Sequence, residues 1–523
     1  MKKLIPVVVI IGIIALIVAL INRPNPHQQT TTQNTSDGDD KQTLTVVTPW
    51  ELTSTDPSTS GFIYQRLGIA ETLVDVDEQG KLIPALASDW HSDDHGKTWY
   101  FRLRDGIKFH DGSTLDSDAV VNALTIALGK PTALESAHIQ AINATDADTV
   151  QFVLQSPLQA FPAYLAHATA IILSPKAYDA KGEVAQVIGT GAYQATLIEP
   201  PQKVEQVAFD GYWGQKAHIK HITYLANSRS ESRTLLAQSS PNHLVYNLDA
   251  ASLARLQADD NLQVHTKSIA RTIQYKVNAK AAPFDDVKVR QILSQAIDRQ
   301  GISESILQID GGMAEQILPP LFADWQLDLS HKKPDYDALK QALFELGFSQ
   351  NAEGKLLDSH GKPVKFTLKT FSDRPELPLV ATALQAQFAK LGIDVDVAIG
   401  NFSDIPASHQ NGTLQMALYA RNYGLIPDPI GTLMEDFDAK GSDWGVMNWQ
   451  NPTLTTLLTQ LNNGQGGESN DIATKKQISQ IIHDEQPITP IVYYQQQVVA
   501  NKKLSGVTLD PFERHFHLNQ LSW

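Results

Sequence analysis

The sequence predicts an α/β protein with more than one lobe, on three observations. The chain has 523 residues, which is too long for one ordinary domain and long enough for two or three with substantial cores. Its hydrophobic content of 42% and aromatic content of 7% are typical of a globular protein. Between residues 272 and 398, strand patterns alternate with amphipathic helix patterns, which indicates an α/β lobe with a mainly open sheet.

Composition excludes several classes of function. The formal net charge of −15 disfavours nucleic acid as a partner, because nucleic acid selects basic surfaces. The chain has no cysteine, which excludes disulfides, thiol nucleophiles and cysteine-ligated metals. The same absence excludes a lipid-modified N-terminal cysteine.

The first 22 residues form a unit of their own, read either as a signal peptide or as an N-terminal membrane anchor. Lys2 and Lys3 precede an almost wholly apolar run at 4–21, which is long for a signal peptide and approaches the roughly 20 residues that span a bilayer. Positive charge before the run predicts that the bulk of the chain is exported. We expect a retained anchor, with cleavage as the alternative, followed by a flexible linker at 23–42.

Residues 90–124 predict a hairpin followed by a helix. Alternating apolar residues at 97–103 indicate a half-buried strand, and 107–109 indicates a second, short one. Asp116 is a suitable helix N-cap, because apolar residues recur at helical spacing after it.

Three pieces of this stretch form a specific succession: Gly96-Lys97-Thr98-Trp99, Leu103-Arg104-Asp105-Gly106, and Lys108-Phe109 followed by Asp111-Gly112. The succession resembles the signature of the family 5 extracellular solute-binding proteins, the peptide- and nickel-type receptors of bacterial ABC importers. The turn Gly189-Thr190-Gly191-Ala192-Tyr193, the stretch 210–224 and the helix pattern at 284–299 extend the resemblance over residues 43 to 520.

The resemblance implies a two-lobed, periplasmic-binding-protein-like α/β fold of type II, cluster C, with an extra subdomain in lobe one and a hinge between the lobes. It divides the exported chain into lobe one at 43–250, with an insert at 114–180, lobe two at 251–488, and a return to lobe one at 489–523.

Local patterns predict the remaining elements in order. Strands are expected at 43–49, 149–154, 219–224, 272–278, 366–370, 393–398, 414–419 and 490–500, and helices at 64–73, 284–299, 336–347 and 379–391.

No constellation in the sequence supports catalysis, so we expect neither an enzyme nor a cofactor. Gly96-Lys97-Thr98 echoes a P-loop, but His91 stands where that motif needs its first glycine. No G-x-S-x-G or H-E-x-x-H spacing occurs. His515 and His517 are two residues apart, and an exposed strand edge explains them better than a metal site.

The best candidate site follows the strand at 414–419. Arg421 can clamp a carboxylate through two parallel hydrogen bonds, and aromatic side chains can supply the apolar walls of a ligand cleft. The resemblance implies further roles: Leu425 stands where dipeptide receptors commonly place an aspartate, and His167 replaces an arginine of the nickel branch. The expected ligand-binding residues are Arg421, Asn422, Tyr423, Trp444, Asn448, Trp50, Tyr64 and His167.

The resemblance implies the substrate-binding component of an ABC importer. It would capture a carboxylate-bearing solute, either a peptide or a nickel or other metal chelate, between the lobes and deliver it to permease subunits of the inner membrane. We expect a monomer in the periplasm, tethered by residues 4–21 or released by signal cleavage. The alternative is a membrane-anchored sensor or chaperone-like binder of the same fold that is not coupled to import.

Overall fold

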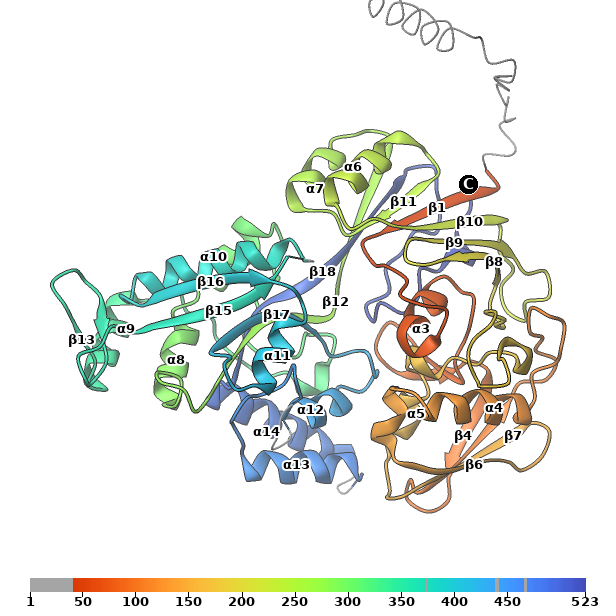
Figure 1. The fold of residues 1–523 in the computed structure, drawn as a ribbon, viewed down its shortest axis with the longest axis horizontal. Helices are drawn as coiled ribbons and strands as arrows, with labels where there is room; N and C mark the ends of the chain where they lie inside the picture. The colour runs from red at the N-terminus through yellow and green to blue at the C-terminus, as the bar shows by residue number, and fades with distance from the viewer. Residues whose placement is uncertain (1–40, 373, 438–441, 465–467) are drawn as a thin grey trace, which may run out of the picture. The chain divides into compact units, whose positions relative to one another are not determined.

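A ten-stranded mixed sheet forms the frame of the protein (Figure 1). In the computed structural model the described residues are 41–523 except 373, 438–441 and 465–467, and 41–523 form one compact unit. The predicted anchor therefore lies outside the described residues. The strand order is β16 (Asp394–Gly400), β15 (Lys365–Phe371), β17 (Met416–Asn422), β12 (Leu262–Val277), β18 (Ile488–Asn501), β11 (His243–Tyr246), β1 (Thr43–Thr48), β10 (His221–Ala226), β9 (Lys203–Ala208) and β8 (Tyr193–Glu199).

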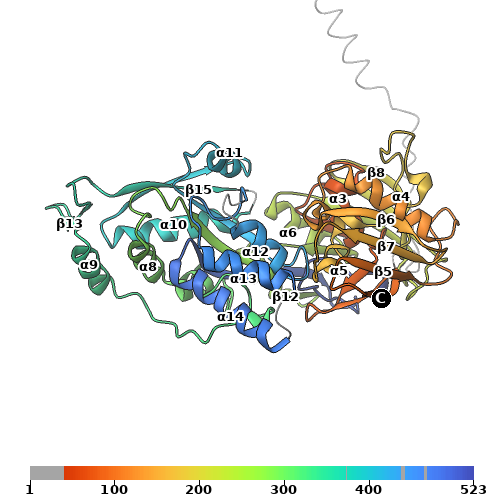
Figure 2. The same ribbon diagram turned by 90° about the horizontal axis from the view of Figure 1, so that it is seen from below.

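Two long antiparallel strands, β12 and β18, join the halves of this sheet. At one end β18 pairs with β11 of lobe one, and at the other β12 pairs with β17 of lobe two. Their mutual pairing shifts register between Ser268 and Thr272. A second shift lies between Ile273 and Gln274, and such interruptions of the ladder bend a strand locally. Figures 1 and 2 show both strands passing between the two groups of elements.

Lobe one contains half of the large sheet and a separate four-stranded sheet. Two of that sheet's strands precede residue 114, so the additional sheet begins earlier in the chain than the predicted insert. Its core includes Phe101, whose ring meets those of Phe152 and Phe161 edge to face at centroid distances of 5.4 and 6.1 Å. The remaining elements of this lobe are α3 (Pro57–Arg66), β2 (Val74–Val76), β3 (Leu82–Pro84), β4 (Ala87–Ser92), β5 (Thr98–Leu103), α4 (Ser117–Leu128), β6 (Ile139–Ala144), β7 (Thr149–Leu154), α5 (Phe161–Tyr164), α6 (Ser230–Ser239) and α7 (Ala250–Gln257).

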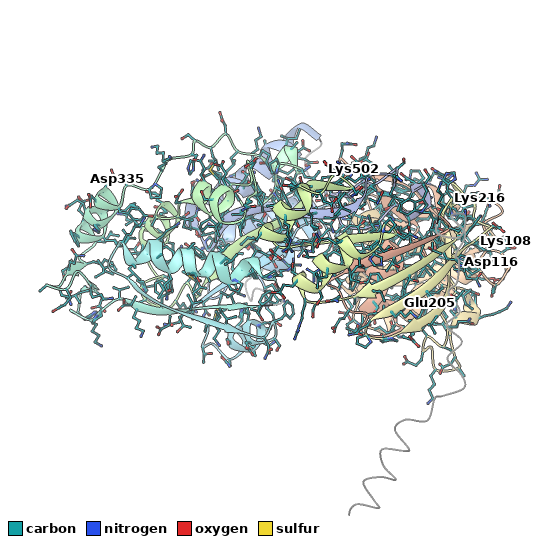
Figure 3. The ribbon with its side chains drawn as sticks, turned by 90° about the horizontal axis from the view of Figure 1, so that it is seen from above. Lys108, Asp116, Glu205, Lys216, Asp335 and Lys502 are labelled. Atoms are coloured by element: carbon teal, nitrogen blue, oxygen red, sulfur yellow. The ribbon has the colours of Figure 1, made fainter. Side chains whose placement is uncertain are left out.

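The hairpin and helix predicted at 90–124 are confirmed. β4 pairs with β5, which buries Trp99, Phe101 and Leu103 on one face. The Asp116 carboxylate, labelled in Figure 3, caps α4 by accepting a hydrogen bond from the Ala119 amide at 2.8 Å. The prediction of a second short strand is wrong, because residues 107–109 contribute only the isolated bridge between Lys108 and Thr114.

The helix predicted at 64–73 is displaced. α3 begins at Pro57 behind the N-cap Asp56 and ends at Arg66. The chain then passes through Gly68, whose positive φ of 67° ends the helix. Close packing explains the glycines of the turn at 189–193. A Cβ on Gly189 would lie 2.1 Å from the carbonyl oxygen of Ile69, and one on Gly191 would lie 2.1 Å from that of Gly68.

Lobe two is an α/β layer structure, as predicted. β15 pairs in parallel with β16 and β17, and β17 pairs antiparallel with β12. The strand 414–419 extends further than expected, to residue 422. Its helices are α8 (Val287–Gln295), α9 (Tyr336–Glu345), α10 (Glu376–Ala389), α11 (Asp404–Gln410), α12 (Ile430–Phe437), α13 (Pro452–Asn462) and α14 (Glu468–Glu485), with a small hairpin of β13 (Ser349–Gln350) and β14 (Leu356–Leu357).

No helix within the described part of the chain has the length and apolar character needed to cross a bilayer.

A buried carboxylate joins the two lobes where the chain returns after β18. Glu513 accepts hydrogen bonds from Arg271 of β12 at 2.7 Å and from Asn422 of β17 at 3.0 Å, and it pairs with Arg66 of α3 at 3.8 Å. Burial by itself raises the pKa of a carboxyl group, but three guanidinium groups, led by that of Arg271, outweigh burial and hold the pKa of Glu513 below its usual value.

Glu513→Gln is expected to destabilise the protein at pH 7 by about 3–5 kcal/mol, because it leaves buried guanidinium groups without their carboxylate. Since the folded-state pKa is depressed, the stabilisation is complete above the unfolded pKa of about 4.3 and is lost as the pH falls through the lower folded value. Urea unfolding at pH 7 and pH 4 measures both effects.

Glu78→Gln is the matched control, because Glu78 makes a partly exposed surface ion pair with Lys267 at 2.8 Å. Its removal should cost less than about 1 kcal/mol. Equal, small losses for the two variants would show that Glu513 does not bind the lobes together.

Candidate ligand-binding cavity

A cavity of about 1130 Å³ lies between the lobes. It is slightly larger than the roughly 300–1,000 Å³ typical of small-molecule sites. Lobe one contributes residues 49–51, 62, 228, 230, 231, 233 and 247–250. The lobe-two side contributes residues 271, 273, 306, 307, 309, 371, 372, 374–376, 379, 402, 419–422, 425, 444, 494, 495 and 497. Much of the lobe-two wall is formed by strand ends and by the loops that follow them.

Arg421 and Asn422 lie in this wall, but within a strand and not in a loop. Both belong to β17, where they pair with Thr272 and Arg271 of β12. Strand pairing fixes their backbone, and long-range contacts then decide where each side chain is held.

The guanidinium of Arg421 is engaged by the protein itself. It donates two hydrogen bonds to the Asp436 carboxylate, at 2.8 and 2.6 Å, and a longer one to Glu435 at 3.3 Å. Burial lowers the pKa of Arg421, but the adjacent carboxylate of Asp436 outweighs burial and holds the pKa above its usual value. The two-bond clamp that the sequence predicts for a ligand is formed with Asp436.

A buried lysine lies behind this ion pair. The Lys276 ammonium contacts Nδ1 of His409 and the carbonyl oxygen of Asp443, both at 2.7 Å. Burial lowers the pKa of Lys276 to about 7; Arg421 acts in the same direction, and the carboxylates of Asp436 and Asp443 oppose it.

Three further arginines line the cavity, Arg233 on the lobe-one side and Arg271 and Arg374 on the lobe-two side, and the sequence analysis missed all three. Arg271 donates from Nε and Nη2 to Glu513 at 3.2 and 2.7 Å. Arg374 is less tightly engaged: it lies 4.0 Å from the Glu376 carboxylate and over the Tyr494 ring, 5.3 Å from its centroid. Its position directly after a parallel strand was the available signal, because ligands of α/β sheets bind beyond the carboxyl ends of strands.

Aromatic side chains cover another part of the lobe-two wall. Phe402 lies on Trp444 with ring centroids 4.6 Å apart, and Phe371 meets it edge to face at 5.4 Å. Tyr419 supports Trp444 from behind, with centroids 5.4 Å apart and a hydrogen bond from its hydroxyl to the Trp444 carbonyl at 2.6 Å. On lobe one, Trp50 lies over the guanidinium of Arg66 at 4.3 Å.

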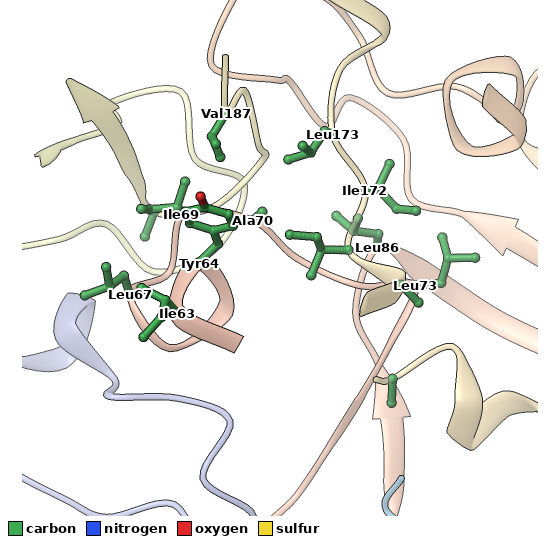
Figure 4. Close-up of a cluster of buried hydrophobic side chains, with 14 of the residues drawn as sticks. Ile63, Tyr64, Leu67, Ile69, Ala70, Leu73, Leu86, Ile172, Leu173 and Val187 are labelled. Atoms are coloured by element: carbon green, nitrogen blue, oxygen red, sulfur yellow. The ribbon is translucent and has the colours of Figure 1, made fainter. Parts of the chain in front are cut away.

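The cavity includes four of the eight predicted residues: Trp50, Arg421, Asn422 and Trp444. Tyr423 is buried in a lobe-two core cluster, where its hydroxyl donates to Gln274 at 2.9 Å. Tyr64 is buried in the lobe-one core among the side chains of Figure 4, and its hydroxyl donates to the Ser54 carbonyl. Neither tyrosine is a cleft wall in this structure.

Asn448 and His167 also lie outside the cavity lining. Asn448 is exposed and donates to the Asn278 side chain at 2.8 Å. Nδ1 of His167 lies 2.8 Å from the Thr169 hydroxyl, and burial, helped by Arg514, lowers the pKa of His167 to about 4. Both side chains are held by local partners within their own lobes.

The histidines near the C-terminus are not on an exposed strand edge. His515 is half-buried and pairs with Asp75 at 2.8 Å, and its ring lies 5.6 Å from that of His517. The carboxylate of Asp75 explains this placement better than strand geometry does. Within the described ranges no group of three or more potential metal ligands occurs.

Lys276→Met is expected to raise stability most below pH 7, where the wild type must bury an ammonium group. Because the lysine pKa is lowered on folding, the folded state binds fewer protons than the unfolded state between pH 7 and about 10, and wild-type stability rises with pH there. The difference in melting temperature between variant and wild type should therefore shrink from pH 6 to pH 9.5. Lys502→Met, at an exposed lysine, is the control and should show no such trend.

Known proteins that resemble this chain over most of its length are solute-binding proteins. The dipeptide-binding protein of Escherichia coli is 24% identical over 469 residues, covering 84% of this chain and 86% of that protein. The nickel-binding protein NikA of Staphylococcus aureus is 26% identical over 455 residues, covering 85% and 87%.

Solved structures share the fold. NikA from Brucella suis in complex with Fe(III)-EDTA superposes with a TM-score of 0.83 at 20% identity, covering 92% of this chain and 99% of that one. DppA from Helicobacter pylori in complex with a peptide gives a TM-score of 0.76 at 21% identity, covering 93% and 99%. The two-lobed fold is thereby confirmed.

The protein family described as "Bacterial extracellular solute-binding proteins, family 5 Middle" matches residues 81–444, more than half of the chain. The chain therefore belongs to family 5 of the bacterial extracellular solute-binding proteins.

Proposed function

We propose that this protein captures a small carboxylate-bearing solute in the cavity between its lobes. A peptide is our first choice for that solute, and a metal chelate is the second. Family membership gives it the function of the solute-binding component of an ABC importer, which delivers its solute to a membrane permease. The names of its relatives, which include a dipeptide-binding and a nickel-binding protein, support the two solute classes.

The distribution of charge across the cavity carries the proposal. The lobe-two wall presents Arg271, Arg374 and Arg421. The lobe-one wall presents the exposed carboxylates of Glu51 and Glu231, while Arg233 of the same wall is buried and donates its hydrogen bonds to backbone carbonyl groups. A zwitterion that spans the cleft can place its carboxylate against the arginines and its amine towards lobe one. A peptide has both groups, which is why we place it first.

Among the arginines, Arg374 is our choice for the ligand carboxylate. Arg421 donates three hydrogen bonds and Arg271 two to protein carboxylates, whereas the nearest carboxylate to Arg374 is 4.0 Å away. Arg421 and Asn422 then act as a charged and polar wall, and Trp50 and Trp444 as apolar walls on the two lobes.

Binding would couple to closure of the lobes about β12 and β18. A ligand that contacts both walls interacts more strongly with a closed arrangement than with an open one, and it shifts the population by that difference in affinity. The closed form would then dock on the permease.

We further propose that the protein is a monomeric, non-enzymatic carrier of the periplasm, tethered by residues 4–21. Family membership supports the carrier function and the periplasmic site of action. No comparison favours the alternative of a sensor that is not coupled to import.

The first test is native mass spectrometry of the full-length protein, purified from cells without refolding. A spread of adducts at peptide masses supports a peptide receptor, and a single adduct with a transition-metal isotope pattern supports a chelate receptor. The wild type and Arg374→Gln are compared directly. Because a charge-assisted hydrogen bond contributes about 1.5–3 kcal/mol, the variant should bind the recovered solute about 10- to 150-fold more weakly by calorimetry.

Arg255→Gln, at an exposed arginine of α7 outside the cavity lining, is the matched control and should bind as the wild type does. If Arg374→Gln also binds as tightly as the wild type, Arg374 does not hold the carboxylate.

A further inference from the structure

We infer that the lobe-two wall holds an apolar subsite that selects solutes with a large hydrophobic side group, preferably an aromatic one. The inference rests on the proposed function and deepens it, because it names the class of peptide. Peptides with an aromatic C-terminal residue are the expected ligands, and small or wholly polar peptides are disfavoured.

Exposed apolar side chains are concentrated in this cavity. The large hydrophobic residues that are exposed in the described chain are Trp213, Leu235, Leu379, Ile399, Phe402, Leu425 and Ile472. Three of them, Leu379, Phe402 and Leu425, line the cavity. Single exposed hydrophobic residues are ordinary, but a group within one concave surface indicates a surface that a ligand covers.

Phe402 is the only aromatic residue among these three, and it is 50% exposed although it belongs to an aromatic cluster. One side of its ring lies on Trp444, and Phe371 packs against it edge to face. These contacts hold the phenyl ring in place, and the exposed side chain contributes to the cavity lining. A ligand ring that covers it would bury apolar area with little loss of side-chain freedom in the protein.

The cluster is itself supported from below. The ring planes of Trp444 and Phe371 are 77° apart, and their centroids are separated by 6.3 Å. The Tyr419 hydroxyl donates a hydrogen bond to the Trp444 backbone carbonyl. Gln274 in turn donates to the Tyr419 hydroxyl at 3.3 Å. The aromatic surface is therefore built on strands β12, β15 and β17, which are among the rigid elements of lobe two.

The proposed carboxylate anchor lies on the same loop as part of the aromatic surface. Phe371 ends β15, Arg374 follows three residues later, and Leu379 lies near the start of α10. A solute that carries its carboxylate and its ring on one residue can reach both parts of this loop. A C-terminal phenylalanine has both groups, separated by a short, flexible link.

The test is isothermal titration calorimetry of the full-length protein with two dipeptide probes, Ala-Phe and Ala-Ala. The wild type is expected to bind Ala-Phe at least tenfold more tightly, because only that peptide can bury a ring on Phe402. Phe402→Ala should weaken Ala-Phe binding about tenfold and leave Ala-Ala binding within twofold. Leu379→Ala, a second cavity variant, should act in the same direction with a smaller effect.

Ile399→Ala is the matched control: Ile399 is 52% exposed, lies three residues before Phe402 on β16, and does not line the cavity. It should leave both affinities unchanged. Melting temperatures show whether each variant is folded; if Phe402→Ala is not, Leu379→Ala decides the matter.

Equal affinity of the wild type for both dipeptides, or an equal loss for both in Phe402→Ala, overturns the apolar subsite and leaves the peptide receptor standing. Failure of both dipeptides to bind, with the protein folded, removes the peptide receptor and the subsite together.

Discussion

Glu513 is the constraint on which the arrangement of the lobes depends. Its carboxylate is almost fully buried and is shared among Arg66 of lobe one, Arg271 of β12 and Asn422 of β17. Charges in such a position are tolerated only when they are paired, so each of these side chains has one favourable arrangement. Because Arg271 and Asn422 also line the cavity, the contact that holds the lobes together fixes one of the cavity's walls.

The charge of that wall depends on buried charged groups behind it as well as on the arginines that line the cavity. Asp436, which is fully buried, neutralises Arg421, while Lys276 adds a positive charge that burial makes easy to lose. The wall therefore presents arginines whose charges are unequally compensated. Arg374, on a loop and not within the sheet, makes only a 4.0 Å contact with a carboxylate, and this is why we propose it as the residue that accepts the ligand.

The two lobes contribute different chemistry to the cleft. Lobe two supplies three of the four lining arginines and the aromatic cluster around Trp444, and lobe one supplies most of the lining carboxylates and Trp50. A ligand that matches both sides gains most when the lobes approach, which is the differential affinity that population shift requires. Under the proposed function, specificity and closure therefore have the same physical origin.

The sequence by itself determined the family, the two-lobed fold and several of the elements, among them the hairpin and helix at 90–124. Periods of 2 and 3.6 residues are local properties, and so are the Asp116 cap and the glycines at 189 and 191; these predictions needed no knowledge of distant partners. Tertiary structure alone decided which side chains face the cleft. Tyr423 and Tyr64 carry the residue types of a cleft wall, but hydrogen bonds hold them in the cores: Tyr423 to Gln274, 149 positions away in the sequence, and Tyr64 to the carbonyl of Ser54, ten positions away. Arg421 meets Asp436 and Phe402 meets Trp444 for the same reason: pairing between segments distant along the chain leaves no periodic signal in either segment.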